Sequence, residues 1–168
     1  NVRTPREREG DLMAQVAACR LGERRLRELA GKYGTSKTRF YLDALQDYSA
    51  RLMRETLARI PDGRYEAEDF LDDDGFSTSP IRLFVTLSVR GRKVRVDFTG
   101  SAPSSRGPVN AVLAITMSAV YYVFRCLLGE DVPACAGLMD PIEVFTPKDS
   151  VVDAKLPAAV AAGNVETS

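Results

Sequence analysis

The sequence contains no histidine among its 168 residues. Histidine is the commonest metal ligand and a frequent general base, because its pKa lies near neutral pH. Its absence excludes a Ser-His-Asp triad, a Cys-His pair and a histidine-ligated zinc site made from this chain alone. Catalysis of these kinds therefore cannot be assigned to these residues by themselves.

The chain also lacks net charge, because 23 basic residues balance 23 acidic ones. Binding to nucleic acid or to an acidic membrane surface normally needs a basic surplus. We therefore expect neither partner.

Cysteine is scarce, with only Cys19, Cys126 and Cys135 present. Their spacing fits no zinc or redox motif, and their odd number favours reduced thiols in the cytoplasm. The sequence starts at Asn1 without an initiator methionine or a signal peptide, which is typical of a processed or trimmed chain.

Two helical patterns occupy the first third of the chain. Apolar residues recur at three- and four-residue spacing at Leu12, Val16, Cys19, Leu26, Leu29 and Tyr33. A second pattern begins near Ser36 or Thr38 and ends at Pro61-Asp62-Gly63, where turn residues follow. The short connection between the two patterns predicts an antiparallel helical hairpin over residues 1–62.

The pattern then changes to a two-residue period. Aliphatic residues at every second position from Ile81 to Val89 alternate with Arg82, Phe84, Thr86 and Ser88, and after Gly91-Arg92 the alternation resumes at Val94, Val96 and Phe98. Such alternation predicts a β-hairpin whose odd-numbered residues from 81 to 89 face the core. Residues 64–70 could add an edge strand. We therefore expect an antiparallel sheet over residues 63–100.

The last part, residues 101–168, is predicted to hold a loop, one buried helix and an extended tail. Residues 111–128 are almost all apolar, which approaches the length of a membrane span. Thr116, Ser118 and Arg125 interrupt the run, and this favours a core helix over a transmembrane one. The whole chain is thus predicted to be a single α+β region.

Two motifs fail as ligand sites. Residues 71–75, Leu-Asp-Asp-Asp-Gly, suggest a calcium loop, but an EF-hand frame would start at Phe70 and end at Ile81, and neither is a carboxylate. An acidic turn between strands fits better. Residues 100–107 lack the Gly-Lys-Ser/Thr ending of a phosphate-binding loop.

At Asp97, where a strand enters a loop of small residues, the residues alone favour a structural turn over a ligand-binding site.

Several short motifs follow one another in a fixed order. They are Asn1-Val2-Arg3-Thr4-Pro5, Gly10-Asp11-Leu12-Met13-Ala14-Gln15, Tyr33-Gly34, Pro61-Asp62-Gly63-Arg64-Tyr65, Asp72-Asp73-Asp74-Gly75, Asp97-Phe98-Thr99-Gly100-Ser101, Gly107-Pro108-Val109-Asn110, Pro157-Ala158-Ala159-Val160 and Gly163-Asn164-Val165-Glu166-Thr167-Ser168. Each motif is short, but the ordered set resembles the B subunits of the hydantoinase/oxoprolinase family over essentially the whole chain. One departure is Cys135, where the family usually has asparagine.

The resemblance implies an ATP-dependent hydrolase that opens small cyclic amides such as hydantoin, N-methylhydantoin or 5-oxoproline. In that family an A-type subunit binds ATP and phosphorylates the substrate oxygen, and the B-type part handles the activated intermediate. Family B subunits are longer than this chain, so the resemblance implies two protein partners, an A-type subunit and the remainder of the B subunit. ATP and a divalent metal are expected in the full enzyme, neither bound mainly by these residues, and the chain alone is expected to be inactive.

The resemblance also selects candidate substrate-binding or interface residues. They are Asp97, Thr99, Gly100, Ser101 and Asn110 in the loop after the strand, and Arg3, Asp11 and Gln15 near the start. No catalytic residue and no metal ligand is assigned. Two alternatives remain open: part of a subunit of an acetone or acetophenone carboxylase, and a non-catalytic part used for assembly.

Overall fold

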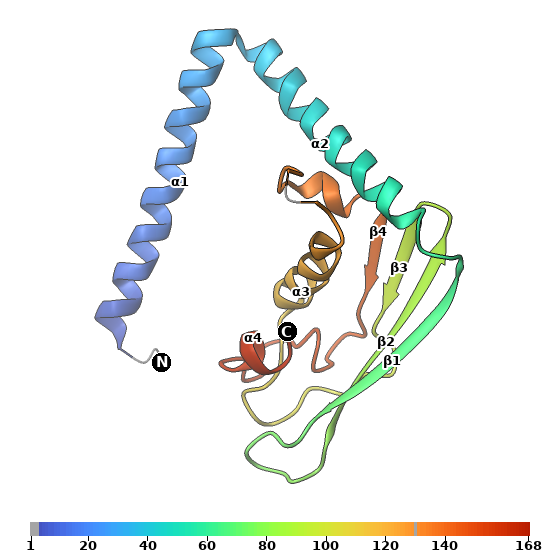
Figure 1. Cartoon of the computed structure of the whole chain (residues 1–168). Coiled ribbons are helices and arrows are strands. Elements are labelled where there is room, and N and C mark those ends of the chain that lie inside the picture. The colour runs from blue at the N-terminus through green and yellow to red at the C-terminus, as the bar shows by residue number, and fades with distance from the viewer. Residues whose placement is uncertain (1–3, 130) are drawn as a thin grey trace. The chain divides into compact units, whose positions relative to one another are not determined.

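The computed structural model describes residues 4–129 and 131–168 (Figure 1). The chain forms two compact units, Asn1–Ala44 and Leu45–Ser168. The elements are α1 (Pro5–Tyr33), α2 (Thr35–Leu57), β1 (Gly63–Leu71), β2 (Ile81–Arg90), β3 (Lys93–Asp97), α3 (Leu113–Cys126), the 3-10 helix η1 (Ala136–Met139), β4 (Ile142–Phe145) and α4 (Gly163–Glu166). Helices and a mixed sheet together confirm the predicted α+β class.

The first unit contains α1 and the start of α2. Gly34 ends α1 with a φ of 86°, a left-handed conformation that glycine adopts without strain. The Gly34 amide bonds to the Ala30 carbonyl, and α2 begins at the next residue. The two predicted helices and the glycine between them are confirmed. However, α1 buries none of its residues, so the packing expected of a helical hairpin is absent from the described part of this unit.

In the second unit, β1, β2 and β3 form an antiparallel meander, as the alternating pattern predicts. Gly91 supplies the positive φ of 59° at the tight turn between β2 and β3. The odd-numbered residues of β2 pack into two apolar clusters, one around Ile81 and the other around Val89, and the predicted register is therefore confirmed. The predicted edge strand is also present as β1.

The prediction of a purely antiparallel sheet is wrong, because β4 pairs with β3 in parallel. The strand order is β1-β2-β3-β4, and α3 lies in the connection from β3 to β4. Two parallel neighbouring strands need a long crossover connection of this kind. The sequence pattern does not reveal β4, because this strand has only four residues and its partner strand is distant in the sequence. For example, Ile142 of β4 pairs with Val94 of β3.

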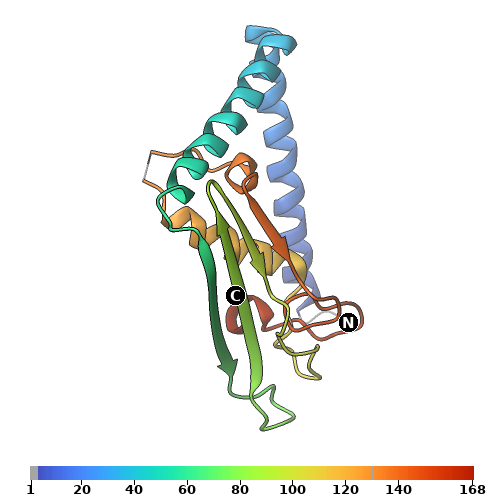
Figure 2. The same ribbon diagram turned by 90° about the vertical axis from the view of Figure 1, so that its right-hand side faces the viewer.

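The main core lies on one face of the sheet. The C-terminal half of α2 contributes Met53 and Leu57, and α3 contributes Val120 and Phe124. Figures 1 and 2 show these two helices on the same side of the strands. The predicted apolar helix is thus present but is buried along one face only: Tyr122 is 70% exposed. Over the described residues, no helix of the chain combines the length and the apolar character that crossing a membrane requires.

Candidate functional site

The turn at the end of β3 is organised by Asp97. One carboxylate oxygen of Asp97 accepts the Thr99 amide at 2.9 Å, and the other accepts the Arg95 guanidinium at 3.3 Å. Partial burial acts to raise the pKa of Asp97, but the Thr99 hydroxyl and amide and the Arg95 charge outweigh it and lower that pKa. Asp97 is therefore an ionised acceptor that orients the turn.

Gly100 and Ser101 tie this turn to β2. Gly100 has a φ of 104°, and its carbonyl accepts the Arg82 guanidinium at 3.3 Å. The Ser101 hydroxyl accepts the Phe84 amide and donates to the Phe84 carbonyl, both at 3.0 Å. The exposed part of the turn is thus Thr99 and Gly100, whereas Ser101 serves the sheet.

Asn110 is completely buried, with an exposed fraction of 0%. Its side-chain oxygen accepts the Ser105 amide at 2.8 Å. Its side-chain nitrogen donates to the carbonyls of Ser105, Gly107 and Ala159, at 3.0, 2.9 and 2.8 Å. This amide is fully used inside the protein, so Asn110 shapes the loop over residues 105–110 from within.

The acidic turn between β1 and β2 is fixed against the same loop by Asp74, which is 7% exposed. Its carboxylate accepts the amides of Phe76 and Ser77 in its own turn, at 2.9 and 2.8 Å, and the Gly107 amide at 3.0 Å. The bonds from Ser77, Phe76 and Gly107 lower the pKa of Asp74, and burial opposes them. The predicted acidic turn is present, and one of its carboxylates is a link between distant loops.

The C-terminal segment completes this arrangement. The Ala162 amide donates to the Pro108 carbonyl at 2.9 Å, and the Thr167 hydroxyl donates to the Val109 carbonyl. A Cβ atom on Gly163 would lie 1.9 Å from the Asn110 carbonyl oxygen, so only glycine allows this approach. Residues 72–77, 105–110 and 159–167 thus form one structure, which we call the loop junction. A small apolar cluster of Ile81, Val109, Val151 and Val152 supports it.

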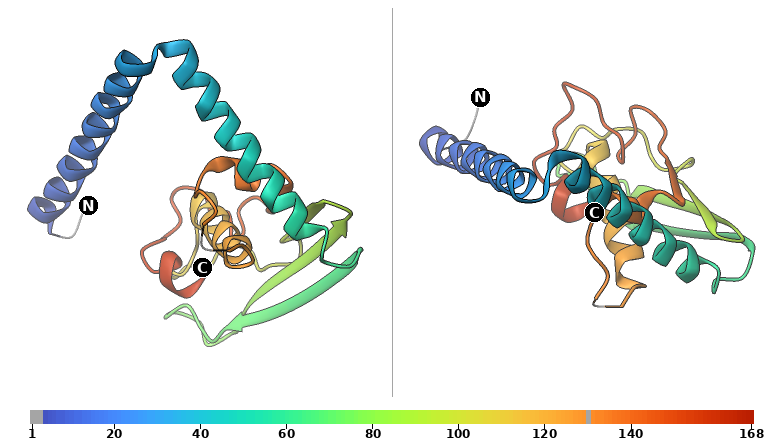
Figure 3. Two further views of the ribbon diagram at one scale, coloured as in Figure 1. Left: turned by 45° about the horizontal axis from the view of Figure 1, so that its top comes forward. Right: turned by 90° about the horizontal axis from the view of Figure 1, so that it is seen from above.

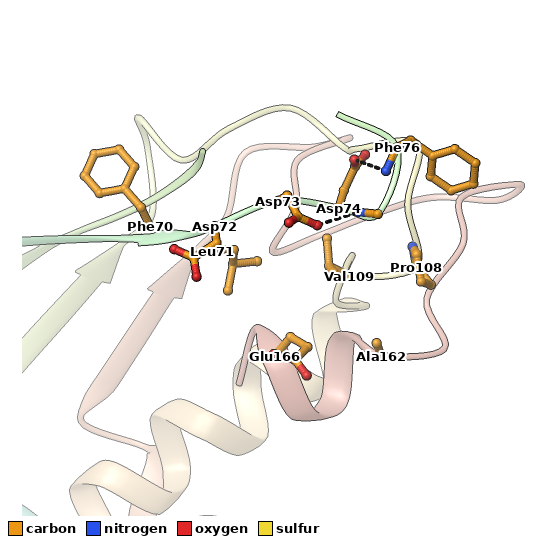
Figure 4. Close-up of a pocket in the computed structure, with 11 residues that line it drawn as sticks. Phe70, Leu71, Asp72, Asp73, Asp74, Phe76, Pro108, Val109, Ala162 and Glu166 are labelled. Atoms are coloured by element: carbon orange, nitrogen blue, oxygen red, sulfur yellow. Dashed lines mark hydrogen bonds between the residues drawn. The ribbon is translucent and has the colours of Figure 1, made fainter. Parts of the chain in front are cut away.

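An open cleft of about 630 Å³ lies at the loop junction. Figure 4 shows its walls: the acidic turn on one side, Pro108 and Val109 on another, and Glu166 of α4 facing them. The cleft carries the carboxylates of Asp72, Asp73 and Glu166. Even so, no three cysteine, aspartate or glutamate side chains are grouped to hold a metal ion within residues 4–129 and 131–168. These residues therefore do not fit a metal site of their own.

The remaining sequence-selected residues lie elsewhere. Arg3 is outside the described residues. Asp11 and Gln15 are exposed on α1, in the other unit, and Asp11 pairs with Arg8 at 2.8 Å. Asp74, Gly163 and Thr167 were not selected as site residues. They lie in motifs that carry the family resemblance, and that resemblance is the signal that could have identified them.

Replacing Gly107 tests the loop junction. A Cβ atom there would lie 1.9 Å from the Asp74 carbonyl oxygen, and backbone must move to relieve the contact. We expect Gly107→Ala to lower the free energy of unfolding by about 1–3 kcal/mol, measured by urea denaturation. Gly129→Ala is the matched control, because a Cβ atom there meets nothing within 4 Å. Equal midpoints for both variants would contradict the close approach.

The chain is similar to known proteins over its whole length. A family model described as hydantoinase B/oxoprolinase matches residues 1–168. The 5-oxoprolinase 1 of Arabidopsis thaliana is 34% identical over 94% of this chain, which covers 13% of that protein. The caprolactamase subunit beta of Pseudomonas jessenii is 31% identical over 94% of this chain, which covers 27% of that subunit.

Two solved structures share the fold. The crystal structure of the ATP-dependent caprolactamase of Pseudomonas jessenii matches all of this chain with a TM-score of 0.81 and 29% identity, and this chain covers 28% of that one. An acetone carboxylase structure matches 96% of this chain with a TM-score of 0.76, and this chain covers 23% of it. At 18% identity the second match shows the fold alone. The chain thus spans less than a third of the relatives it matches.

Proposed function

Because this chain belongs to the hydantoinase B/oxoprolinase family, we propose that it forms part of the B-type subunit of an ATP-dependent enzyme that hydrolyses small cyclic amides. Two relatives are named for the cyclic amides that such enzymes open: a 5-oxoprolinase and an ATP-dependent caprolactamase. The observation that carries the proposal is the loop junction. Three segments that are far apart in the sequence, residues 72–77, 105–110 and 159–167, meet there through hydrogen bonds and close backbone approaches.

The chemistry of the reaction explains why a B-type part would hold such a structure. An amide is a poor electrophile, and ATP in the whole enzyme supplies the phosphoryl group that makes its oxygen a good leaving group. The activated compound must be kept from bulk water, which favours a site between subunits. We propose that the exposed Thr99–Gly100 turn and the cleft at the loop junction face that site or the ATP-binding A-type subunit.

In this proposal the residues of the chain have two different roles. Thr99 and Gly100 offer a hydroxyl and a backbone amide to a polar group, as their exposure allows. Asp97, Ser101, Asn110 and Asp74 hold the surrounding backbone in place through the bonds described above. Arg3, Asp11 and Gln15 are proposed interface residues, and their partner lies outside this chain.

The test uses the complete B-type protein together with its A-type subunit and ATP. We expect turnover of hydantoin, 5-oxoproline or caprolactam by the complex and none by the 168-residue chain alone. In the complex, Thr99→Val should lower kcat/KM about tenfold, or about 1.4 kcal/mol, because the hydroxyl that Thr99 offers to a polar group is lost. Thr99→Ser should restore most of the activity.

The control for this variant is Thr78→Val, which changes an exposed threonine outside the turn. Its kcat/KM should equal that of the parent. Melting temperatures of all variants should agree, since Thr99 is exposed. If Thr99→Val loses stability and activity in parallel, the turn is scaffolding and the active site lies in the remainder of the enzyme.

A carboxylase of small ketones is the second candidate function. Its basis is the family resemblance of the sequence motifs, and the acetone carboxylase structure, at 18% identity, adds only that the fold is shared. ATP-dependent incorporation of labelled bicarbonate into acetone or acetophenone by the same complex separates the two reactions. A third possibility is that the chain has only a structural role in the enzyme. In that case, variants of the exposed turn should leave both activities unchanged.

A further inference from the structure

The exposed turn after β3 contains one peptide unit that is not bonded inside the described part of the chain. Residues 98–101 form a β-turn, closed by the Ser101 amide, which donates to the Phe98 carbonyl at 3.1 Å. At its centre lies the peptide unit between Thr99 and Gly100. Neither its amide nor its carbonyl has a hydrogen-bond partner among the residues that the structure describes. Because both residues are exposed, the Gly100 amide is a donor available at the surface.

The direction of this amide depends on the two peptide units beside it. Type I and type II turns differ in the two backbone angles that flank the central peptide unit, so this unit can face either way. Gly100 has a φ of 104°, which has the sign of a type II turn and suits glycine. On one side, the Thr99 amide donates to the Asp97 carboxylate. On the other side, the unit between Gly100 and Ser101 is held through its carbonyl by Arg82.

Arg82 is itself held in place by its neighbours in the sheet. The strands β1 and β2 lie side by side (Figure 3), and one carboxylate oxygen of Glu68 on β1 lies 2.9 Å from two guanidinium nitrogens of Arg82. The guanidinium carbon lies 4.3 Å from the centre of the Phe84 ring. The third nitrogen donates to the Gly100 carbonyl at 3.3 Å. The planar guanidinium therefore joins β1 to the turn in a defined geometry.

We propose that Arg82 is a positioning residue, which directs the Gly100 amide toward an oxygen of the activated amide substrate. This inference rests on the proposed function. A backbone amide that is aimed in advance at an oxygen where negative charge develops stabilises the transition state more than the bound substrate. Arg82 acts through Gly100, because its three guanidinium nitrogens are already bonded to Glu68 and to the Gly100 carbonyl.

Steady-state kinetics of the complete B-type protein with its A-type subunit and ATP test this role, with 5-oxoproline, hydantoin and caprolactam as substrates. Arg82→Met should lower kcat about tenfold and change KM by less than about twofold, because the aimed amide acts in the transition state. Arg82→Lys should regain only part of kcat, since one ammonium group cannot hold both Glu68 and Gly100 as the guanidinium does. The melting temperatures should equal that of the parent, because the pair with Glu68 is exposed and contributes little stability.

Arg64→Met is the matched control. It breaks another exposed arginine–glutamate pair of the sheet, between Arg64 and Glu66 of β1, which are 2.7 Å apart. Its kcat and KM should equal those of the parent. The proposal is overturned if Arg82→Met keeps the kcat of the parent, or if its kcat and its melting temperature fall together.

Amide hydrogen exchange in the 168-residue chain gives a second readout that needs no activity. The Gly100 amide should exchange faster than those of Ser101 and Ala102, which donate to the carbonyls of Phe98 and Arg82 at 3.1 and 2.8 Å. Arg82→Met should speed the exchange of Ser101 about tenfold, because the lost contact holds the peptide unit of that amide. Ala102 should be unaffected, since its partner is the backbone of residue 82.

The two readouts keep the two proposals apart. An unchanged Ser101 exchange rate in Arg82→Met overturns the positioning role, whatever the enzyme hydrolyses. Absence of turnover in the parent complex would instead contradict the proposed function, and the exchange rates would still decide whether Arg82 holds the turn.

Discussion

Val89→Asp is expected to abolish folding of the second unit. Val89 is 3% exposed and lies in the main cluster with Leu57 of α2 and Phe124 of α3. A carboxylate there would be buried without a partner, and this costs several kcal/mol. That cost is comparable with the whole stability of a small domain, about 5–15 kcal/mol. Circular dichroism should show loss of the cooperative thermal transition.

The neighbouring variant Ser88→Asp provides the control. Ser88 is on the other face of β2, opposite Arg95 of β3 and Arg64 of β1. An acidic residue between two arginines should leave the melting temperature unchanged or raise it slightly. Similar melting of the two variants would show that the register of β2 is wrong, since a shift by one residue exchanges the two faces.

The local parts of the fold could be predicted from the sequence. Strict alternation from Ile81 to Val89 specifies a strand and its buried face, and Gly91 specifies the turn. The parallel pairing of β4 could not be predicted, because it depends on how α3 returns the chain to the sheet. Helix burial was over-predicted for a similar reason: an apolar run shows that a helix can be buried, and only the tertiary structure shows which face is covered.

The candidate site was predicted unevenly. The orienting role of Asp97 follows from a local rule, since aspartate commonly accepts the amide two residues later. The role of Asp74 does not, because its decisive bond reaches Gly107, 33 positions along the chain. Asn110 was expected to be able to bind a ligand, and its bond to Ala159, 49 residues away, shows that its amide is already occupied. A hydrogen bond between residues that are far apart in the sequence produces no periodic pattern from which it could be predicted.

Asn110→Ala is expected to lower the free energy of unfolding by about 3–5 kcal/mol. The change removes one acceptor and two donor hydrogens from a fully buried side chain, and it leaves the amide and carbonyl of Ser105 and the carbonyl of Ala159 without this partner. Each unsatisfied buried group costs about 1–3 kcal/mol, and such networks are among the few causes of large single-residue effects. Urea denaturation measures the loss, with the exposed Asn164→Ala as control.

Asn110→Asp separates the hydrogen-bond argument from a packing argument, because it keeps the shape and removes the donors. An ionised aspartate would set its charge against three carbonyl oxygens, so the folded state should raise the pKa of that carboxyl above the unfolded value. The free energy of unfolding of the variant should therefore be lowest at neutral pH. It should rise as the pH falls through the raised pKa, because protonation restores one donor. The parent should show no such gain. A pH-independent loss would mean that Asn110 acts by filling space, and its hydrogen bonds would not be what holds the loop junction.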